Sequence, residues 1–303
     1  MVRERPLTTG LLILLLPALL GSIGCATSGS KKPRYAYTPE EFRQELRTRV
    51  PESAERLTRA PFELDDQVIE RARKVVMAAP RGPARVQALV DFLSEPDPSG
   101  LGLRYSWATS TTAKQTIELR RGNCFALASV LVGLGRGIGW PIYYAEARTR
   151  RPETQEFEEV TALSDHMVVI VTAKTVQLII DFTGLVEPGY EIRPIDDLTA
   201  YAHLINNVAG QRLMASEGAA SDQDWQAALA GFTLATRIQP NLGRAWNNLG
   251  IVYGRLGRFD EAREAYLRAL ELDTAFGSPE RNLSLMETRA SGATSLIESR
   301  LRE

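Results

Sequence analysis

Reactive side chains are scarce in this chain of 303 residues. It has two cysteines, Cys25 and Cys124, and two histidines, His166 and His203. Cys124 directly precedes an apolar run with helical spacing, so we expect it in the first turn of a helix. The unpaired N–H groups and the dipole of that turn favour a thiolate, which is a nucleophile. Cys124 is therefore the candidate nucleophile.

His166 is the better candidate for a general base. It opens the apolar run 166–171, which predicts a strand whose first residue faces a cleft. His203 lies in a predicted helix over 195–207, where we interpret it as a surface or packing residue. A base placed beside a cysteine can take its proton, as in nucleophilic catalysis by a Cys–His pair.

Asp181 is the candidate partner of His166. If segments 166–171 and 176–181 pair as an antiparallel hairpin closed over 172–175, Asp181 lies directly opposite His166. Opposed residues share a face, with Cβ atoms about 5 Å apart, so the carboxylate would orient the imidazole ring. A register slip of one residue would send the carboxylate to the other face.

The elements that would position these residues are helices followed by strands. Thr38 and Glu41 form a predicted capping box around Pro39, which marks the start of the first helix. Further helices are predicted around 68–76, 86–92 and 124–136, and strands over 142–147, 166–171 and 176–181. This order predicts an α+β fold.

Four segments of this region resemble the successive motifs of the bacterial transglutaminase-like superfamily. They are Gly122-Asn123-Cys124-Phe125-Ala126-Leu127-Ala128, Gly139-Trp140-Pro141, Asp165-His166-Met167-Val168-Val169 and Ile180-Asp181-Phe182-Thr183. The resemblance covers about 62–195 and implies a papain-like domain with an antiparallel sheet. It also implies that Cys124 is the nucleophile, His166 the base and Asp181 the residue that orients it. Met167 departs from the family, whose members often have an aromatic residue there.

The expected activity is thiol-dependent acyl chemistry on a peptide or glutamine amide, without a cofactor. The backbone N–H of Cys124 is the first candidate oxyanion donor, and Trp107 or Gln115 is a candidate for the second. Either water or an amine can resolve the acyl-enzyme, and we favour hydrolysis, since many bacterial relatives of this kind are thought to be peptidases. The alternative is a catalytically silent periplasmic scaffold that works through its repeats.

Residues 1–24 are predicted to be an export signal. Arg3 and Arg5 form a basic start, and the apolar run 11–20 is shorter than the roughly 20 residues that span a bilayer. Cys25 follows Ser22-Ile23-Gly24, which resembles a bacterial lipobox although Ser22 stands where leucine is usual. An ordinary cleaved signal with an incidental cysteine is the alternative.

Lipidation of Cys25 would anchor the chain to a membrane through the tether 25–37. Ala26 resembles the default signal for the outer membrane, so we expect the periplasmic face of that membrane in a bacterial cell envelope. An acylated Cys25 would also leave Cys124 without a disulfide partner.

Two other classes of ligand are disfavoured by composition. Acidic and basic residues nearly cancel, at 37 against 36, and no basic stripe is present, which argues against nucleic acid. Two thiols and two distant imidazoles are too few for an ordinary zinc site, so no metal is expected.

The C-terminal third repeats itself at an offset of 34 residues, the period of tetratricopeptide repeats. The clear unit carries the full pattern except that Thr274 replaces proline: Trp246, Leu249, Gly250, Tyr253, Ala262, Tyr266 and Ala269. We therefore divide the folded chain into a transglutaminase-like domain over 38–205 and an all-α tetratricopeptide region over 206–303. The repeats are expected to bind a protein partner, and a plain helical hairpin without a ligand is the alternative.

Overall fold

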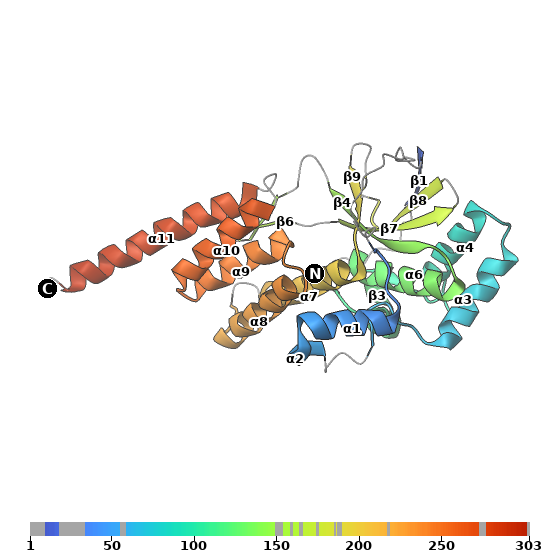
Figure 1. The fold of residues 1–303 in the computed structure, drawn as a ribbon, viewed down its shortest axis with the longest axis horizontal. Coiled ribbons are helices and arrows are strands. Elements are labelled where there is room, and N and C mark those ends of the chain that lie inside the picture. Colours follow the sequence, from blue (N-terminus) through green and yellow to red (C-terminus); the bar gives the residue numbers. More distant parts are fainter. Residues whose placement is uncertain are drawn as a thin grey trace, which may run out of the picture. The chain divides into compact units, whose positions relative to one another are not determined.

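The computed structural model describes residues 10–17, 34–54, 59–148, 154–157, 160–163, 166–173, 176–184, 186, 190–216, 219–272 and 277–301. Its contacts divide the chain into two compact units. The first contains residues 1–150 and 165–200, and the second contains residues 151–164 and 201–303. Each unit is described by itself (Figure 1).

The first unit combines one antiparallel sheet with helices. Its strands are β1 (Gly10–Pro17), β2 (Arg104–Tyr105), β3 (Arg121–Gly122), β4 (Ile142–Arg148), β7 (His166–Ala173), β8 (Val176–Asp181) and β9 (Glu191–Pro194). Its helices are α1 (Pro39–Arg49), α2 (Pro51–Ala54), α3 (Asp66–Ala78), α4 (Pro83–Ser94), α5 (Ala113–Leu119), α6 (Cys124–Ile138) and the start of α7 (Asp197–Ala215). The main sheet has the order β1-β8-β7-β4-β9, and β2 pairs with β3 separately.

Helix α6 is the centre of this unit. Every residue from Cys124 to Gly135 is buried, as expected for a helix that is apolar on all sides. It packs against β4 and β7 of the sheet and against α3, α4 and α5 (Figure 1). Gly139 ends it in the left-handed conformation, with φ of 95°, which a glycine adopts without strain.

The local signals of the sequence mostly match these elements. The capping box of Thr38 and Glu41 is present at the start of α1. The predicted helices around 68–76, 86–92 and 124–136 are confirmed as α3, α4 and α6, and the three predicted strands as β4, β7 and β8. The prediction omitted β9 and the short helix α5.

The apolar segment predicted as the core of an export signal forms strand β1. It pairs antiparallel with β8 at the edge of the sheet, and Gly10 lies opposite Asp181. Cys25 and the lipobox lie outside the described residues. Over the part of the chain that the structure describes, no helix combines the length and the hydropathy required to cross a bilayer.

The second unit is a series of helical hairpins with one short β-hairpin. It contains β5 (Thr154–Phe157), β6 (Val160–Leu163), the rest of α7, α8 (Asp222–Ile238), α9 (Gly243–Arg255), α10 (Phe259–Leu272) and α11 (Gly277–Leu301). Consecutive helices from α8 to α11 pack on each other, and β6 packs on α11. Helix α7 continues past the expected domain boundary at 205.

Candidate active site

Cys124 is the first residue of α6, as its sequence context predicts. Asn123 is the N-cap: its side-chain oxygen accepts a hydrogen bond of 3.1 Å from the Ala126 N–H. The Asn123 amide in turn donates to Ser110 Oγ at 2.6 Å, which holds the cap in place. Cys124 is 8% exposed and has no disulfide partner. The thiol therefore lies at an N-terminus whose geometry is locked by two hydrogen bonds.

Gly122 is required for this arrangement. A Cβ at that position would lie 2.5 Å from the Cβ of Ala126 and 3.0 Å from Cγ2 of Thr116. Such distances are far inside van der Waals contact, and both neighbours are buried in helices. Only glycine therefore allows β3 to run this close to the first turn of α6.

His166 and Asp181 meet across the hairpin of β7 and β8. Nε2 of His166 lies 2.5 Å from Oδ1 of Asp181, and the two side chains are 12% and 2% exposed. The Cys124 side chain lies beside the imidazole and helps to raise the pKa of His166. Because Nε2 already faces the carboxylate, Nδ1 is the ring nitrogen that remains for the sulfur. The structure thus brings the three predicted site residues together around one imidazole.

The predicted register of this hairpin is wrong by two residues. Val169 pairs with Ile180 and Ala173 with Val176, so the residue opposite His166 is Thr183 rather than Asp181. Strand β7 continues two residues further into the turn than we expected, to Ala173, while β8 begins at Val176 as expected, and this moves every partner by two. A shift of two residues leaves Asp181 on the same face of the sheet as His166, because side chains alternate between faces. A diagonal neighbour on that face is still within reach of a long side chain. Asp181 therefore reaches His166 diagonally.

Thr183 is a site residue that sequence reasoning missed. Its hydroxyl lies 2.8 Å from Oδ1 of Asp181 and 3.0 Å from Nε2 of His166, and its backbone N–H donates to the same Oδ1 at 2.8 Å. The Val186 N–H donates to Oδ2 at 2.9 Å. These donors hold the carboxylate in one orientation. The correct hairpin register was the signal that would have identified Thr183.

The surroundings of the imidazole are small and apolar. Ala147 of β4 lies directly opposite His166 and is 3% exposed. It belongs to a buried cluster with Ala145, Val168, Ile170, Ile179 and Val186. The ring is therefore flanked by apolar side chains, while its polar contacts come from Asp181, Thr183 and Cys124.

His166 and Asp181 have pKa values that are shifted in opposite directions. Burial alone would lower the pKa of His166, but its hydrogen bonds to Asp181 and Cys124 and the charges of those groups raise that pKa to about 10. Burial would raise the pKa of Asp181, yet the hydrogen bond and charge of His166, together with the N–H groups of Thr183 and Val186, lower that pKa to about 2. At neutral pH the site therefore contains an imidazolium and a carboxylate.

The two guesses for a second oxyanion donor have different outcomes. Gln115 is exposed, and its Oε1 accepts hydrogen bonds from the N–H and the hydroxyl of Thr112, where it closes the capping box of α5. Its side chain therefore caps the N-terminus of α5. Trp107 follows two residues after Tyr105, which pairs in parallel with Gly122, so it lies on the segment that neighbours Cys124. It is 46% exposed, and its role remains a prediction.

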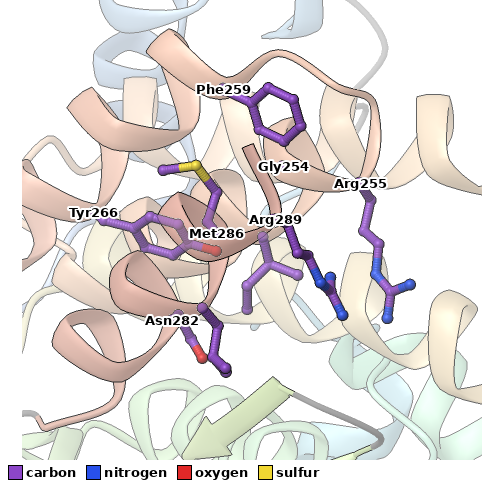
Figure 2. Close-up of a pocket in the computed structure, with 9 residues that line it drawn as sticks. Gly254, Arg255, Phe259, Tyr266, Asn282, Met286 and Arg289 are labelled. Carbon is purple, nitrogen blue, oxygen red and sulfur yellow. The ribbon is translucent and has the colours of Figure 1, made fainter. Parts of the chain in front are cut away.

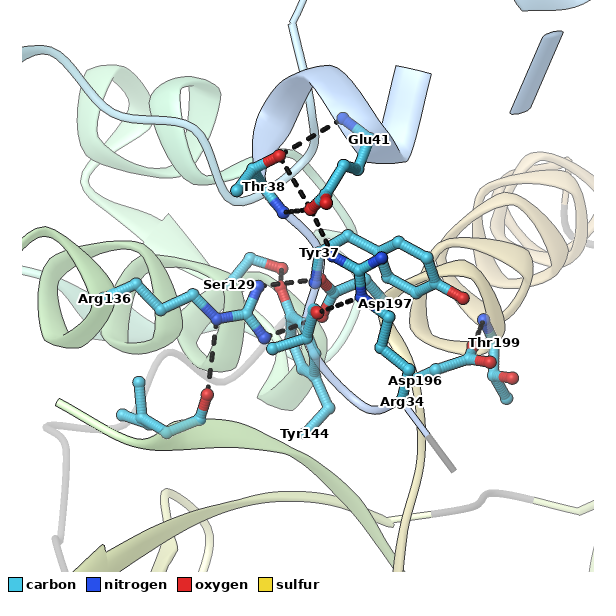
Figure 3. Close-up of polar contacts among 12 residues, drawn as sticks. Arg34, Tyr37, Thr38, Glu41, Ser129, Arg136, Tyr144, Asp196, Asp197 and Thr199 are labelled. Atoms are coloured by element: carbon cyan, nitrogen blue, oxygen red, sulfur yellow. Dashed lines mark hydrogen bonds and ion pairs between the residues drawn. The ribbon is translucent and has the colours of Figure 1, made fainter. Parts of the chain in front are cut away.

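A buried polar network supports the other end of α6 (Figure 3). Arg136 donates to both oxygens of Asp197, at 2.7 and 2.8 Å, and the Tyr37 N–H donates to the same carboxylate at 2.9 Å. Burial raises the pKa of Asp197, and its contacts with Arg136 and Tyr37 counter that effect in part. On the same helix, Ser129 accepts a hydrogen bond from Tyr144. These contacts hold α6 in position, and Cys124 is the first residue of that helix.

The other histidine, His203, lies in the second unit. It is 2% exposed, so of the two roles that we considered, surface or packing, the structure supports packing. Among the described residues, no group of three or more His, Cys, Asp or Glu side chains is arranged to hold a metal ion.

The second unit has the packing that its repeat pattern predicts. Gly250 of α9 faces the ring of Tyr266 in α10: a Cβ there would lie 2.7 Å from Cε1 of Tyr266. Trp246 Nε1 donates to the carbonyl of Pro240 at 2.9 Å. Ala262, Ala265 and Ala269 are buried where the helices touch. Small residues thus allow the helices to approach, and aromatic rings fill the space between them.

Comparisons with known proteins identify this part of the chain. Residues 243–274 match the family model described as tetratricopeptide repeat. A search of curated proteins returned no match. The matched segment covers α9 and α10 and begins at the first residue of α9. Residues 243–274 are therefore a tetratricopeptide repeat, a module that indicates binding to a protein partner.

Proposed function

We propose that this chain is a thiol-dependent hydrolase or acyltransferase whose tetratricopeptide repeat recruits a protein partner. One observation carries the catalytic half: a thiol, an imidazole and a carboxylate from three separate elements meet at a single ring. Each is scarce or buried, so their meeting calls for a chemical rather than a packing explanation. The match over 243–274 supports the partner-binding half.

In the proposed reaction, the Cys124 sulfur attacks the carbonyl carbon of a peptide or glutamine amide. The imidazolium of His166 gives its Nδ1 proton to the leaving nitrogen as the C–N bond breaks, which leaves a thioester on Cys124. Water then attacks the thioester, His166 takes its proton, and the C–S bond breaks to restore the thiolate. A primary amine in place of water would give transfer instead of hydrolysis. Asp181 and Thr183 keep the ring aligned throughout.

The resemblance to the transglutaminase-like superfamily belongs to this proposal. The four quoted motifs lie on β3–α6, on the turn before β4, at the start of β7 and at the end of β8. The resemblance gives Cys124, His166 and Asp181 the roles of nucleophile, base and orienting acid, and the contact of His166 with Asp181 supports that assignment. We assign this role to the domain over 38–205.

Labelling of the thiol tests the catalytic half. Intact-mass analysis after treatment with iodoacetamide near neutral pH should show fast modification of Cys124 in the wild type and slow modification in His166→Gln. His203→Gln is the matched control, because it removes the second histidine of the chain, which is buried in the other unit, and it should label at the wild-type rate. A wild-type rate in His166→Gln would overturn the proposal.

We also propose that the mature protein is a lipoprotein anchored through Cys25 at the periplasmic face of the outer membrane. Residues 1–24 would then be removed on export, and β8 would become the edge of the sheet. The test is fractionation of cells that express Cys25→Ala, which should shift the protein from the membrane to the soluble fraction. Unchanged fractionation would contradict lipidation.

A scaffold without catalysis is the second candidate, and the repeat over 243–274 favours it. Complementation of a gene deletion with the Cys124→Ala variant distinguishes the two functions. Rescue by Cys124→Ala would support the scaffold and exclude the enzyme. Failure of Cys124→Ala to rescue, with normal amounts of folded protein, would exclude the scaffold as the sole function.

A further inference from the structure

Helix α6 begins without a carboxylate. Several other helices, such as α1, α3, α8 and α10, have Asp or Glu in the first turn, where the partial positive charge of the helix end attracts an anion. The first turn of α6 has none, and its N-cap is the uncharged Asn123. Cys124 is therefore the residue of that turn that can supply an anion, as a thiolate.

The side-chain amide of Asn123 is held at both of its polar atoms. Its Oδ1 accepts from the Ala126 N–H at 3.1 Å, and its Nδ2 donates to Ser110 Oγ at 2.6 Å. The Asn123 backbone is fixed as well, because its N–H donates to the Thr109 carbonyl at 2.8 Å. Asn123 is 5% exposed and Ser110 is 7% exposed. A buried, uncharged group with one orientation thus adjoins Cys124.

Hydrogen bonding alone does not explain why this group is an amide. Asp and Asn cap helices about equally well, and the helix dipole favours a carboxylate over an amide. Aspartate at position 123 could accept from the Ala126 N–H and from the Ser110 hydroxyl, since a hydroxyl donates as well as accepts. The same unit has Asp65 at the N-cap of α3. The difference lies in charge, because a carboxylate next to Cys124 would oppose a thiolate there.

The charged groups of the neighbouring elements do not place a free carboxylate at Cys124. Strand β7 contributes His166, which carries a proton, and Asp181 of β8 lies against Nε2 of that ring. Strand β4 contributes Glu146, which pairs with Arg148 at 3.3 Å. Strand β3 contributes the exposed Arg121. The buried residues of α5, which packs on α6, carry no charge. An aspartate at position 123 would thus change the charge around the sulfur.

We propose that Asn123 is a positioning residue that caps α6 without placing a negative charge beside Cys124. Ser110 supports it, because the serine oxygen holds the amide in the capping orientation. The positive end of the helix dipole is then left to the sulfur, which is the attacking atom of the proposed reaction. The inference rests on the catalytic half of the proposed function and names the group that keeps the nucleophile reactive.

The pH profile of Cys124 labelling by iodoacetamide, measured on the full-length protein, tests the effect of charge. Iodoacetamide is uncharged, so a new carboxylate does not repel it. In Asn123→Asp we expect the profile to move to higher pH, with labelling slower by about threefold or more on its rising limb. The urea midpoint should stay near that of the wild type, because the two residues are equivalent caps. A merely structural cap would leave the profile in place.

Asn123→Ser is the complementary variant. Serine is an uncharged N-cap, but it has no amide to donate to Ser110, so the bond of 2.6 Å is lost. We expect the urea midpoint to fall while the pH profile keeps its wild-type position. Arg289→Gln is the charge control, because it changes the net charge by the same amount at an exposed position of α11 in the second unit (Figure 2). It should not move the profile.

Four results would overturn the inference. They are an unmoved profile in Asn123→Asp, an equal shift in Arg289→Gln, an equal shift in Asn123→Ser, and loss of the fold in Asn123→Asp. The third would trace the effect to shape, and the fourth would show that the two caps are not equivalent at this position.

Failure of the proposed function gives a different result. Wild-type Cys124 would then label slowly, at the rate of His166→Gln, and both proposals would fall. Fast labelling that depends on His166, together with an unmoved profile in Asn123→Asp, would support the enzyme and exclude the role of the uncharged cap.

Discussion

The imidazole of His166 has a different kind of partner on each side. Nε2 faces the carboxylate of Asp181 and the hydroxyl of Thr183, and Cys124 helps to raise the pKa of the same ring. Asp181 is itself held by the N–H groups of Thr183 and Val186. The orientation of the imidazole therefore depends on hydrogen bonds made by a few residues in and after β8.

Loss of the Thr183 hydroxyl should loosen the ring. We expect Thr183→Val to label at Cys124 about 3-fold to 10-fold more slowly, because one net hydrogen bond contributes about 0.5–1.5 kcal/mol. Thr183→Ser keeps the hydroxyl and should label like the wild type. The rate of iodoacetamide modification measures the effect, and equal rates for Thr183→Val and the wild type would remove Thr183 from the positioning role.

The raised pKa of His166 makes stability depend on pH. The folded protein holds the imidazole proton up to about pH 10, whereas the unfolded chain loses it near 6.5. The stabilisation is therefore complete below about pH 6.5 and is lost as pH rises through about 10, by at most about 1.4 kcal/mol per pH unit. Urea unfolding at pH 6, 8 and 9.5 should show a difference between the wild type and His166→Gln that shrinks as pH rises. A difference that grows would contradict the assignment.

At the scale of elements, α6 is held at both ends by different chemistry. Its N-terminus is fixed by the Asn123 cap and its C-terminal half by the ion pair of Arg136 with Asp197. The side chain of Asp197 is fully buried, at 0% exposure. Breaking a buried pair leaves an uncompensated charge, which is costly.

Arg136→Met should therefore lower the free energy of unfolding by about 3–5 kcal/mol. Arg47→Met is the matched control, because Arg47 pairs with Glu40 at 3.4 Å on the surface, where both side chains are more than half exposed. The control should change stability by less than about 1 kcal/mol. Urea unfolding measures both, and equal effects of the two variants would refute a structural role for the buried pair.

Arg120 is the one described non-glycine residue with a positive φ, at 53°. It ends α5 in the left-handed conformation, where glycine is preferred because a Cβ costs roughly 1–2 kcal/mol. Arg120→Gly should therefore stabilise the protein by about 0.5–1 kcal/mol after the added entropy of the unfolded chain. Arg121→Gly, in the neighbouring strand β3, should destabilise it. A fall in the urea midpoint of Arg120→Gly would show that the arginine side chain itself contributes.

At the scale of the whole molecule, the chain consists of two compact units with different tasks in the proposal. The first contains the Cys124 site, and the second contains the tetratricopeptide repeat. The contacts around His166 come from α6, β7, β8 and the segment after β8, all of which belong to the first unit. Damage to the repeat should thus leave the site intact.

Gly250→Val tests that separation. The valine Cβ would lie 2.7 Å from the ring of Tyr266, which is 3% exposed and cannot move aside cheaply. We expect a loss of about 1–3 kcal/mol from overpacking in the second unit, with Cys124 labelled at the wild-type rate. Unfolding curves and intact-mass labelling measure the two effects, and a slower labelling rate would show that the units are coupled.

The sequence by itself determined the features that depend on neighbours along the chain. The capping box at Thr38, the apolar faces of α3, α4 and α6 and the 34-residue repeat are written in local spacing, because helix formation and repeat packing follow periods of a few residues. The scarcity of cysteine and histidine selected Cys124 and His166 before any fold was known.

Only the tertiary structure decided the features that depend on pairing between distant segments. The register of β7 with β8 moved by two residues, because the pairing continues to Ala173 and Val176 and local spacing does not specify where a turn begins. That shift revealed Thr183 and left Asp181 on the correct face. The pairing of β1 with β8 and the pair of Arg136 with Asp197 likewise arise from segments that meet only after folding.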